Sequence, residues 1–538
     1  MTEPSKPIGL TALGVLCALG NDGETVLRRA LAGDTSGMRR VSGVLPNGDV
    51  SLFGFAELPK ETEAPGVGAR SRCERLTAAA YAQIASEAAA LKARYTPARI
   101  GVVLGTSNST MEEFTANPDH IDMGTPAEFL KKLAGVEGPA YVVSTACSSS
   151  AKAFGAARRL IENDVCDAVL VGGVDAYTRA VLNGFYALEV LSPTLARPLG
   201  ENRTGINLGE GAAIFVMERS AEAPVLLLGV GESSDAYHLT APDPEGRGAL
   251  AAMQAALDDA GITPGAVEYV NLHGTGTMYN DRAECGAVAS LFGENVAVSS
   301  TKPLTGHTLG AAGAIDAALC WLMLKHGSSA LPHVLSGARD AALPPLPVVP
   351  VGAALHPRTV ISTSFAFGGS NAAVLLGNRL PHYSMERLLA HRKPMILISD
   401  YDDDSFSAAG MTVWAEVSED DVFYDSVLGG TPPCTALEYM AQSVACYVGL
   451  TFLRQGEEPP VGFVLGSRSL KLDVRAFVPG VRYSVHVAPQ FSDGRFSSFE
   501  TSISDAAGRV IAAAALNVFR PETAELEAIR DGRNPEEF

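Results

Sequence analysis

The sequence is poor in charge and lacks several patterns that would assign a function directly. Of its 538 residues only 19% are charged whereas 47% are hydrophobic, a balance that excludes a disordered chain. No apolar run approaches the roughly 20 residues that a membrane-spanning helix requires. The length favours two or three domains, because a single hydrophobic core does not grow to this size.

Basic residues are scarce as well. Lys and Arg number 41 against 60 Asp and Glu, so the formal net charge is −19. Phosphate binding needs a basic surface, and nucleic acid is therefore not expected as a partner. An acidic carrier protein is not excluded, since it would need only a local basic patch.

The eight cysteines form no C-x-x-C pair and no cluster with histidine at zinc spacing, so no metal site is expected. Most lie in apolar runs, which indicates buried, reduced thiols and a cytoplasmic protein. Ile8–Gly20 could pass for a signal peptide, but its interior glycines and the polar Asn-Asp-Gly-Glu that follows argue against cleavage. The segment is predicted to be a buried first strand and turn.

Over residues 1–377, short β-branched runs alternate with Ala-rich stretches. This alternation predicts an α/β domain with largely parallel strands. The expected strands include Ile100–Gly105, Ala168–Val171 and Tyr269–Leu272, and the expected helices Leu76–Lys92, Ser149–Glu162, Gly248–Ala260 and Thr308–Lys325.

An internal sequence repeat indicates that this domain consists of two related halves. Residues 143–157 resemble residues 298–312: in both, a strand end leads through small polar residues into a helix that contains Gly-Ala-Ala. Such helices are common in α/β proteins, but the shared order and context favour a duplication. Two related halves would bring Cys147 close to His307.

The pattern of the sequence changes near residue 377. Residues 378–387 are polar and predicted to be a linker, 388–521 a second domain, and 522–538 a charged, loosely ordered tail. One helix among antiparallel strands predicts an α+β fold for the second domain. The expected helix is Cys434–Leu453, and the expected strands are Met395–Ile398, Met411–Val417, Val481–Val487, Ser497–Ile503 and Val510–Phe519.

Cys147 lies among small residues in Ser144-Thr-Ala-Cys-Ser-Ser-Ser150, just before a predicted helix. A helix N-terminus favours a thiolate, which could accept an acyl group from a thioester. His273 and His307 each lie beside glycine, where the backbone can turn sharply, and their neutral N–H groups could stabilise an enolate. The alternative is a buried structural cysteine with two ordinary loop histidines, but the three together favour a site. We expect Lys302 and Glu284 to form a buried ion pair that orients the histidines.

A second candidate site lies in the C-terminal domain. Glu438 is surrounded by apolar residues near the start of the long helix, as either a general acid or an ordinary first-turn glutamate. Three histidines follow residue 377: His382 in the linker, His391 before the first strand and His486 within a strand. His391 is the best candidate for a base, whereas His486 should face solvent or the opposite side of its sheet.

Residues from about 8 to 377 resemble the elongating β-ketoacyl-acyl-carrier-protein synthases of the thiolase fold. The resemblance implies a duplicated, five-layered α/β fold, with Cys147 as the acyl-accepting nucleophile and His273 and His307 assisting decarboxylation and condensation. The motifs are Ser144-Thr-Ala-Cys147, Gly209-Glu-Gly-Ala212, Asn271-Leu-His-Gly-Thr-Gly-Thr277, Asp281 with Glu284, Ser300-Thr-Lys-Pro-Leu-Thr-Gly-His307 and Ser364-Phe-Ala-Phe-Gly-Gly-Ser-Asn371.

The same resemblance implies how substrate is held. Thr275 and Thr277 would contact the phosphopantetheine arm, which the acyl carrier protein brings, so the chain itself needs no bound cofactor. Phe367 would gate the acyl pocket, and its N–H and that of Cys147 would form an oxyanion hole. Substrate would also be bound by the adjacent Gly368 and Gly369.

Residues from about 388 to 521 resemble the hot-dog-fold 3-hydroxyacyl-carrier-protein dehydratases. The fatty-acid type carries its base in Gly-His-Phe-Pro before the helix, whereas residues 419–426 here contain no histidine. The resemblance then implies His391 as the base and Glu438 as the acid. The motifs are His391-Arg-Lys-Pro-Met-Ile-Leu397, Leu437-Glu-Tyr-Met-Ala-Gln442, Gly462-Phe-Val-Leu-Gly-Ser-Arg468 and Ser498-Phe-Glu500.

The combination most resembles the enzymes of aryl polyene biosynthesis, in which condensation and dehydration repeat without enoyl reduction. A ketoreductase would act in trans, because the chain has no Gly-x-Gly-x-x-Gly loop. The alternative is a fatty-acid elongation synthase whose C-terminal module is a silent dimerisation or carrier-docking surface. A homodimer and a hetero-oligomer with a related synthase-like subunit both remain open.

Overall fold

The structure, a computed structural model, describes residues 7–59, 68–69, 71–111, 122–220, 222–380, 382–454, 457–522 and 525–526. Two compact units divide between Pro381 and His382, within the segment predicted to be a linker. Most of the predicted charged tail lies outside the described residues. Within the described part of the chain, no helix is long and apolar enough to cross a membrane.

The N-terminal unit is built on a ten-stranded mixed sheet with the order β11-β10-β12-β13-β9-β1-β8-β6-β4-β5. The prediction of largely parallel strands is wrong, since β1, β8, β9 and β13 pair only antiparallel. The short pairing of β1 with β9 joins two five-stranded halves. The strands are β1 Ile8–Leu16, β4 Ile100–Gly105, β5 Ala140–Val143, β6 Ala168–Asp175, β8 Gly211–Arg219, β9 Val225–Ser234, β10 Tyr269–Asn271, β11 Ala297–Ser299, β12 Thr359–Phe365 and β13 Ser370–Gly377.

The two halves repeat one pattern of pairing. In the first, β4 is parallel to both β5 and β6, and β6 and β8 continue antiparallel; in the second, β10 is parallel to both β11 and β12, and β12 and β13 continue antiparallel. The prediction of a duplication is confirmed by this topology. Cys147 follows β5 and His307 follows β11, so they occupy equivalent positions in the halves.

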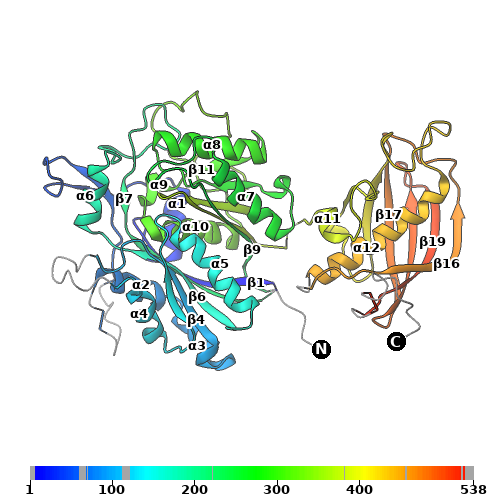
Figure 1. Cartoon of the computed structure of the whole chain (residues 1–538), viewed down its shortest axis with the longest axis horizontal. Helices are drawn as coiled ribbons and strands as arrows, with labels where there is room; N and C mark the ends of the chain where they lie inside the picture. Colours follow the sequence, from blue (N-terminus) through cyan, green and yellow to red (C-terminus); the bar gives the residue numbers. More distant parts are fainter. Residues whose placement is uncertain are drawn as a thin grey trace. The chain divides into compact units, whose positions relative to one another are not determined.

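Helices cover the sheets in layers (Figure 1). Helices α5 and α10 pack against each other and against strands of both halves, α2 and α4 cover the first half, and α7 covers the second, with α8 packed against α7. A three-stranded sheet of β2 Met38–Val41, β3 Ser51–Gly54 and β7 Leu208–Gly209 lies apart from these layers. The helices are α1 Gly23–Leu31, α2 Arg72–Ala82, α3 Ala85–Arg94, α4 Thr125–Ala134, α5 Ser149–Glu162, α6 Arg179–Ala187, α7 Arg247–Ala260, α8 Met278–Phe292, α9 Lys302–Thr305 and α10 Ala312–Lys325.

The packing of the central helices α5 and α10 depends on the size of the side chains around them. Helix α10 is apolar on nearly every side, as expected for a helix enclosed by protein. Helix α5 begins directly against β4, where a Cβ at Gly105 would lie 2.2 Å from the Ser150 nitrogen. A glycine in β4 is therefore required for the start of α5, and with it Cys147, to lie at the centre of the unit.

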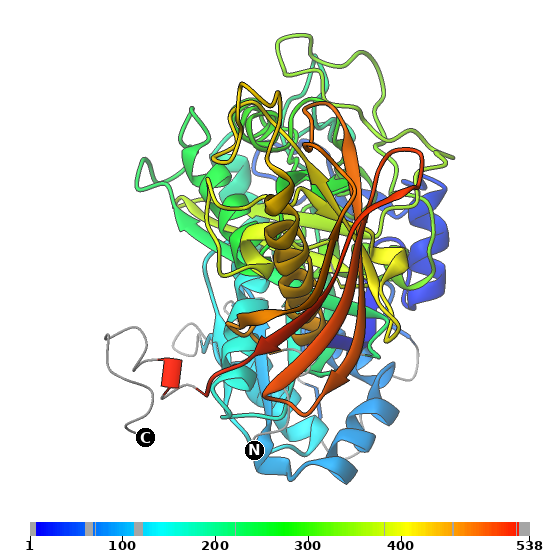
Figure 2. The same cartoon turned by 90° about the vertical axis from the view of Figure 1, so that its right-hand side faces the viewer.

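The C-terminal unit is a six-stranded antiparallel sheet beside one long helix, α12 (Figure 2). The strand order is β14-β15-β17-β18-β19-β16, and alternate residues of β15 and β17 are buried. Its elements are α11 Met385–Leu388, β14 Asp400–Tyr401, β15 Met411–Glu416, α12 Ala436–Arg454, β16 Phe463–Leu472, β17 Arg482–Ser492, β18 Phe496–Ser504 and β19 Val510–Phe519.

Two predicted elements are wrong. Met395–Ile398 forms no strand, because the Leu397 N–H donates to the Gln442 side chain, at 2.8 Å, instead of to a neighbouring strand. The single helix expected over Leu76–Lys92 is two helices, α2 and α3. At the break, the Gln83 amide bonds to backbone groups of Val15 and Asn21 and so fastens the turn to the first strand.

Candidate active sites

Cys147 lies at a strained turn between β5 and α5. Ala146 has φ of 52°, a left-handed conformation that is uncommon for a residue with a Cβ. Hydroxyl groups fasten the turn: Ser149 Oγ accepts from Thr145 N at 2.9 Å and donates to Ala146 O at 2.5 Å. The three serines after Cys147 are fully buried, and we infer that they hold the thiol at the start of α5.

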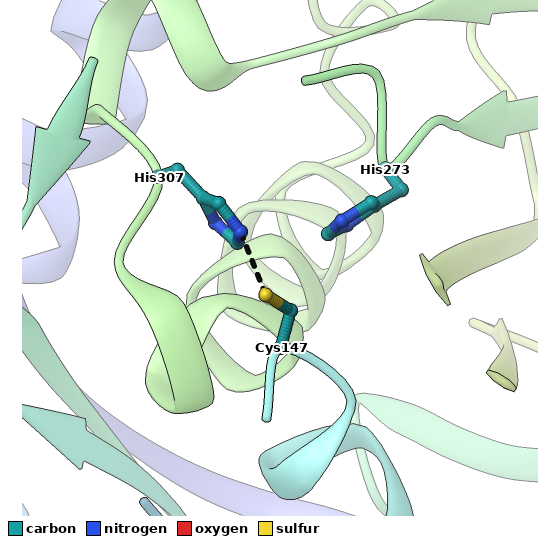
Figure 3. A group of neighbouring side chains, drawn as sticks. All are labelled: Cys147, His273 and His307. Carbon is teal, nitrogen blue, oxygen red and sulfur yellow. Dashed lines mark hydrogen bonds between the residues drawn. The ribbon is translucent and has the colours of Figure 1, made fainter. Parts of the chain in front are cut away.

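His307 comes from the equivalent turn of the second half. Its Nε2 lies 3.0 Å from Cys147 Sγ (Figure 3). Gly306, with φ of 70°, makes the turn possible, since a Cβ there would lie 2.5 Å from the Leu208 carbonyl oxygen. The expected proximity of Cys147 and His307 is confirmed.

His273 completes the group. Its ring lies 5.1 Å from the His307 ring, nearly perpendicular to it, and both rings point toward the sulfur (Figure 3). Donor atoms of the three side chains lie within 4.8 Å of one another, close enough for a metal ion to bridge them. The hydrogen bond between Sγ and Nε2 already joins two of these atoms.

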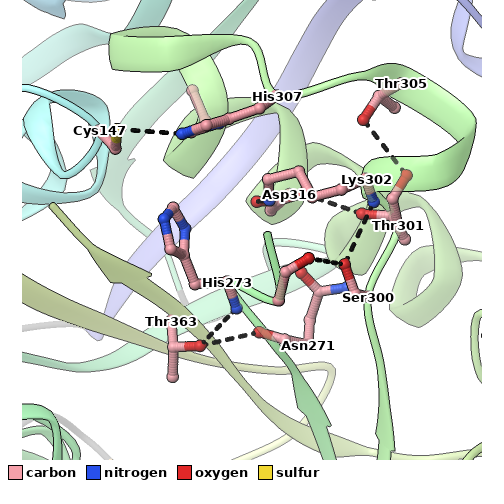
Figure 4. A network of polar contacts seen from close by, with 12 residues as sticks. Cys147, Asn271, His273, Ser300, Thr301, Lys302, Thr305, His307, Asp316 and Thr363 are labelled. Carbon is pink, nitrogen blue, oxygen red and sulfur yellow. Dashed lines mark hydrogen bonds and ion pairs between the residues drawn. The ribbon is translucent and has the colours of Figure 1, made fainter. Parts of the chain in front are cut away.

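The predicted ion pair between Lys302 and Glu284 is wrong. Lys302 Nζ lies 2.6 Å from Asp316 on α10, and both groups are buried (Figure 4). Glu284 instead accepts from the backbone N–H groups of His273 and Gly274, each at 2.7 Å, and from the Thr363 hydroxyl. Glu284 therefore holds the loop that carries His273, while Asp316 neutralises Lys302.

Burial determines the protonation of this site. It raises the pKa of the Cys147 thiol to about 12, although Lys302 opposes the rise. It lowers the pKa of His307 to about 3, and the pKa of His273 well below its ordinary value, with Lys302 adding to both shifts. The resting group is thus a neutral thiol beside two neutral imidazoles, not the thiolate that a helix terminus alone would favour.

A cavity of about 90 Å³ opens onto the three side chains, and Thr275, Thr277 and Phe367 line it. The Phe367 ring stacks on Phe185 at 5.9 Å. The backbone N–H groups of Phe367 and Cys147 oppose the rise in the pKa of the Cys147 thiol, although less than Lys302 does. Thr275, Thr277 and Phe367 therefore lie at this cavity, and the roles expected for them stay predictions.

Gly368 and Gly369 form the turn between β12 and β13 and do not belong to the cavity lining. Gly368 N donates to Leu239 O at 2.7 Å, and both glycines have positive φ. They shape the turn that presents Phe367 and are not placed to bind substrate in this cavity.

The second site joins His391 and Glu438. His391 Nε2 lies 3.6 Å from Glu438 Oε1, at the start of α12. The side chains are 38% and 34% exposed, so Glu438 is not buried among its apolar neighbours. His486, by contrast, is exposed on β17 between the buried Val485 and Val487, as predicted.

Gln442 positions this pair. Its Nε2 donates to Glu438 Oε1 at 2.8 Å and to Met395 O at 2.7 Å, while its Oε1 accepts from Leu397 N. It therefore ties the segment after His391 to the helix that carries Glu438. Gln442 was not predicted as a site residue, although its position one helical turn after Glu438 was an available indication.

Matches to known protein families also divide the chain into an N-terminal and a C-terminal part. Residues 60–223 and 225–336 match the N-terminal and C-terminal domains of beta-ketoacyl synthase, and residues 383–530 match the ApeP dehydratase family. The 3-oxoacyl-[acyl-carrier-protein] synthase 2 of Staphylococcus aureus (strain COL) is 33% identical over 416 residues, which cover 69% of this chain and 98% of that protein. The enzyme of the same name from Coxiella burnetii is 32% identical over 419 residues, with the same coverage.

Solved structures extend the likeness. The ketosynthase ApeO in complex with its chain length factor ApeC, from Xenorhabdus doucetiae, is 41% identical with a TM-score of 0.64, covering 69% of this chain and 98% of that one. The ishigamide ketosynthase/chain length factor is 26% identical with a TM-score of 0.62, covering 69% and 99%. The N-terminal unit therefore has the thiolase-like ketosynthase fold, and the chain belongs to the beta-ketoacyl synthase family, with an ApeP-like dehydratase domain joined to it in one bifunctional enzyme.

Proposed function

We propose that the chain performs two steps of acyl-chain building on carrier-bound thioesters: decarboxylative condensation at Cys147, and dehydration of the 3-hydroxyacyl product at His391 and Glu438. The observation that carries the proposal is the 3.0 Å contact between Cys147 Sγ and His307 Nε2, with the His273 ring beside them. A ketoreductase acting in trans would convert the 3-oxoacyl product of the first step into the substrate of the second.

Condensation begins with transfer of an acyl group to the sulfur. The thiol proton can pass to His307 Nε2 across the hydrogen bond as Sγ attacks the thioester carbonyl, and the carrier thiol leaves with a proton. Malonyl thioester then loses carbon dioxide, and the neutral N–H groups of His273 and of His307, the latter in the tautomer protonated at Nε2, stabilise the enolate oxygen. The enolate carbon attacks the carbonyl carbon of the acyl group on Cys147, whose oxygen the N–H groups of Cys147 and Phe367 would hold. The C–S bond breaks, the 3-oxoacyl thioester forms on the carrier, and the released Cys147 thiolate takes up a proton from solvent.

Dehydration needs a base and an acid on one side of the substrate. His391 would remove a proton from C2, and Glu438 would protonate the leaving hydroxyl group on C3, giving a 2-enoyl thioester and water. The 3.6 Å separation of the two side chains supports this assignment. Their unit, an antiparallel sheet beside a long helix, fits the hot-dog fold.

Two sets of partners follow. The substrates of both steps would be presented by an acyl carrier protein on its phosphopantetheine arm, which Thr275 and Thr277 would contact. A related ketosynthase-like subunit would be the second partner, by analogy with the complex of ApeO and its chain length factor. Repeated cycles without enoyl reduction would give a conjugated polyene of the aryl polyene type.

The two half-reactions can be tested separately. With an acyl primer and malonyl-carrier protein, the chain should release carbon dioxide and form 3-oxoacyl-carrier protein, and Cys147→Ala should abolish the product. With purified 3-hydroxyacyl-carrier protein it should form the 2-enoyl species, and His391→Ala or Glu438→Gln should remove that activity. His486→Ala is the matched control, because it removes an exposed histidine of the same unit. Retention of dehydration in both site variants would refute the assignment of the second site.

A further inference from the structure

One buried carboxylate of the N-terminal unit has no part in the steps described above. Asp175 ends β6 and is fully buried. Burial raises the pKa of its carboxyl group, and the groups that oppose this rise most are hydroxyl and backbone N–H donors, not a cation. The Thr106 hydroxyl is one of these donors. A buried carboxylate is costly unless hydrogen bonds hold it, so the groups that donate to Asp175 indicate what it does.

The hydrogen bonds of Asp175 join two turns. In the loop after β4, Ser107 donates through its N–H at 3.1 Å and its hydroxyl at 2.8 Å, and Asn108 donates through its N–H at 3.1 Å. In the turn His307–Gly310, here called the His307 turn, Gly310 N donates to Asp175 Oδ2 at 2.6 Å. One carboxylate therefore ties the loop after β4 to the turn that carries a histidine of the condensing site.

The His307 turn needs such a restraint. Its entrance is fixed by the His307 N–H, which donates to Asn207 O at 2.7 Å. Leu309 then has φ of 56°, a left-handed conformation that is unfavourable for a bulky residue and persists only where neighbouring contacts hold it. The next N–H, that of Gly310, is the one that Asp175 accepts. Asp175 therefore fixes the exit of the turn.

The end of β6 also packs closely against the start of α5. A Cβ at Gly173 would lie 2.5 Å from Ser150 Cβ and 3.1 Å from Ala311 Cα. This strand end therefore fits tightly between α5 and the residue that follows the His307 turn. The charge of Asp175 also contributes to the raised pKa of the Cys147 thiol. Asp175 thus acts on the thiol as well as on the histidine that faces it.

The second half of the unit shows that packing alone does not require a carboxylate here. The last pair of β6 and β8 is Asp175 with Gly211, and the last pair of the equivalent strands β12 and β13 is Phe365 with Asn371. Phe365 packs its ring 6.3 Å from the His273 ring. The strand end that holds a phenylalanine in one half therefore holds a carboxylate in the other.

We propose that Asp175 is a positioning residue for condensation: by accepting from Gly310 and from the loop after β4, it fixes the turn that keeps His307 Nε2 against Cys147 Sγ. It acts through His307 and is not itself a catalytic residue. The inference deepens the condensation step of the proposed function and rests on it.

The first test separates positioning from stability. Asp175→Asn keeps the size of the side chain but turns an amide N–H toward other donors, which should loosen the turn. Its kcat for condensation should fall at least tenfold, whereas KM for malonyl-carrier protein should change less than twofold. Glu218→Gln is the matched control, because Glu218 is a buried carboxylate near the opposite end of β8 and accepts from Arg94 at 2.9 Å. An equal loss of kcat in the control would assign the effect to general destabilisation and overturn the inference.

The second test does not need condensation. Iodoacetamide alkylates the thiolate of Cys147, and mass spectrometry of its peptide gives the rate as a function of pH. In Asp175→Asn the midpoint of this profile should move to lower pH by at least about half a unit, because a negative charge near the thiol is lost while Lys302 remains. Such a shift in a chain that forms no 3-oxoacyl product would support the placement of Asp175 and refute the condensation. Unchanged kcat in a folded Asp175→Asn variant would overturn the inference and leave condensation at Cys147 standing.

A third variant keeps the carboxylate. Ser107→Ala removes the hydroxyl that donates to Asp175 at 2.8 Å and accepts from Gly310 N at 3.2 Å. Its kcat should fall about threefold with KM unchanged. This variant decides the matter if Asp175→Asn does not fold, and a kcat equal to that of the unaltered chain would then overturn the inference.

Discussion

The two sites of this chain differ in how far they are withdrawn from water. His273 and His307 are each 2% exposed and hydrogen-bonded or packed within one unit, whereas the His391 and Glu438 side chains are 38% and 34% exposed. Burial shifts the pKa of all three groups at the first site, so packing decides its protonation. At the second site, the hydrogen bonds of Gln442 hold the segment after His391 next to Glu438. Damage to packing should therefore impair the first site, and damage to positioning the second.

Cys147→Ala should produce the largest difference between the activities of the two sites. Removing the acyl-accepting sulfur should lower condensation by roughly 10³-fold or more, whereas dehydration of supplied 3-hydroxyacyl-carrier protein should change by less than about twofold. Rates of both half-reactions on the same preparation would measure the contrast. Parallel losses would mean that the two units do not act independently.

Breaking the buried pair under the first site should cost stability. Lys302→Met leaves the Asp316 carboxylate buried without its partner, and should lower the free energy of unfolding by about 3–5 kcal/mol. Chemical denaturation would measure this, with the double variant Lys302→Met/Asp316→Leu expected to recover much of the loss. The control is Lys393→Met, since that lysine is 82% exposed. A loss as small as that of the control would contradict the assigned pair.

The second site should respond to loss of positioning. Gln442→Met keeps the side-chain length but removes the hydrogen bonds to Glu438, Met395 and Leu397, at a cost of about 1–3 kcal/mol. Dehydration should fall roughly tenfold through kcat with little change in KM, because the variant removes only contacts that position the reacting pair. Condensation should be unaffected. A change confined to KM would assign Gln442 to substrate binding instead.

The smallest expected effect is that a change in pH shifts the stability of the two units in opposite directions. His273 and His307 have lowered pKa values, so their contribution to the stability of the N-terminal unit is fully present above the ordinary histidine pKa of about 6.5. This contribution should fall by about 1.4 kcal/mol per pH unit per histidine as the pH drops. His382 bonds through both ring nitrogens to Asp403 and Asp400, and chiefly Asp403 raises its pKa. Its contribution is present at low pH and lost as the pH rises through that raised pKa.

Hydrogen exchange would resolve the two responses. Amides of α10 should lose protection at pH 5.5, whereas those of β14 and β15 should lose it at pH 8.5. The carboxylates facing His382 are also paired with Arg454 and Arg482, so the alkaline effect is expected to be small. The variant His382→Gln should abolish the alkaline loss alone. The same sign of change in both units would contradict the account.

Much of the first site could be predicted from the sequence, because Cys147 and His307 lie in equivalent turns of the two halves. The bounds predicted for the helix after Cys147, Ser149–Glu162, are those of α5, and the duplication placed His307 beside the thiol. The partner of Lys302 could not be predicted in this way. Asp316 lies in an apolar helix fourteen residues later, and only the packing of α10 brings its carboxylate to the ammonium group.

The second unit was less predictable for a related reason. Periodicity indicated the long helix and the strands β15, β17, β18 and β19, but β16 was missed, since its residues are exposed on both faces and give no alternation. At Met395–Ile398 an apolar run suggested a strand, yet the backbone there bonds to the side chain of Gln442. Such a side-chain contact leaves no periodic pattern in the sequence.

The most direct test of the central claim is mass spectrometry of carrier-bound products from a complete reaction. It would contain an acyl primer, malonyl-carrier protein, a ketoreductase with NADPH, and this chain. We expect a 2-enoyl species that is replaced by the 3-hydroxyacyl species when His391 or Glu438 is substituted, while condensation persists. Accumulation of the 3-hydroxyacyl species with the unaltered chain would contradict it, and would leave the C-terminal unit as a docking or dimerisation module.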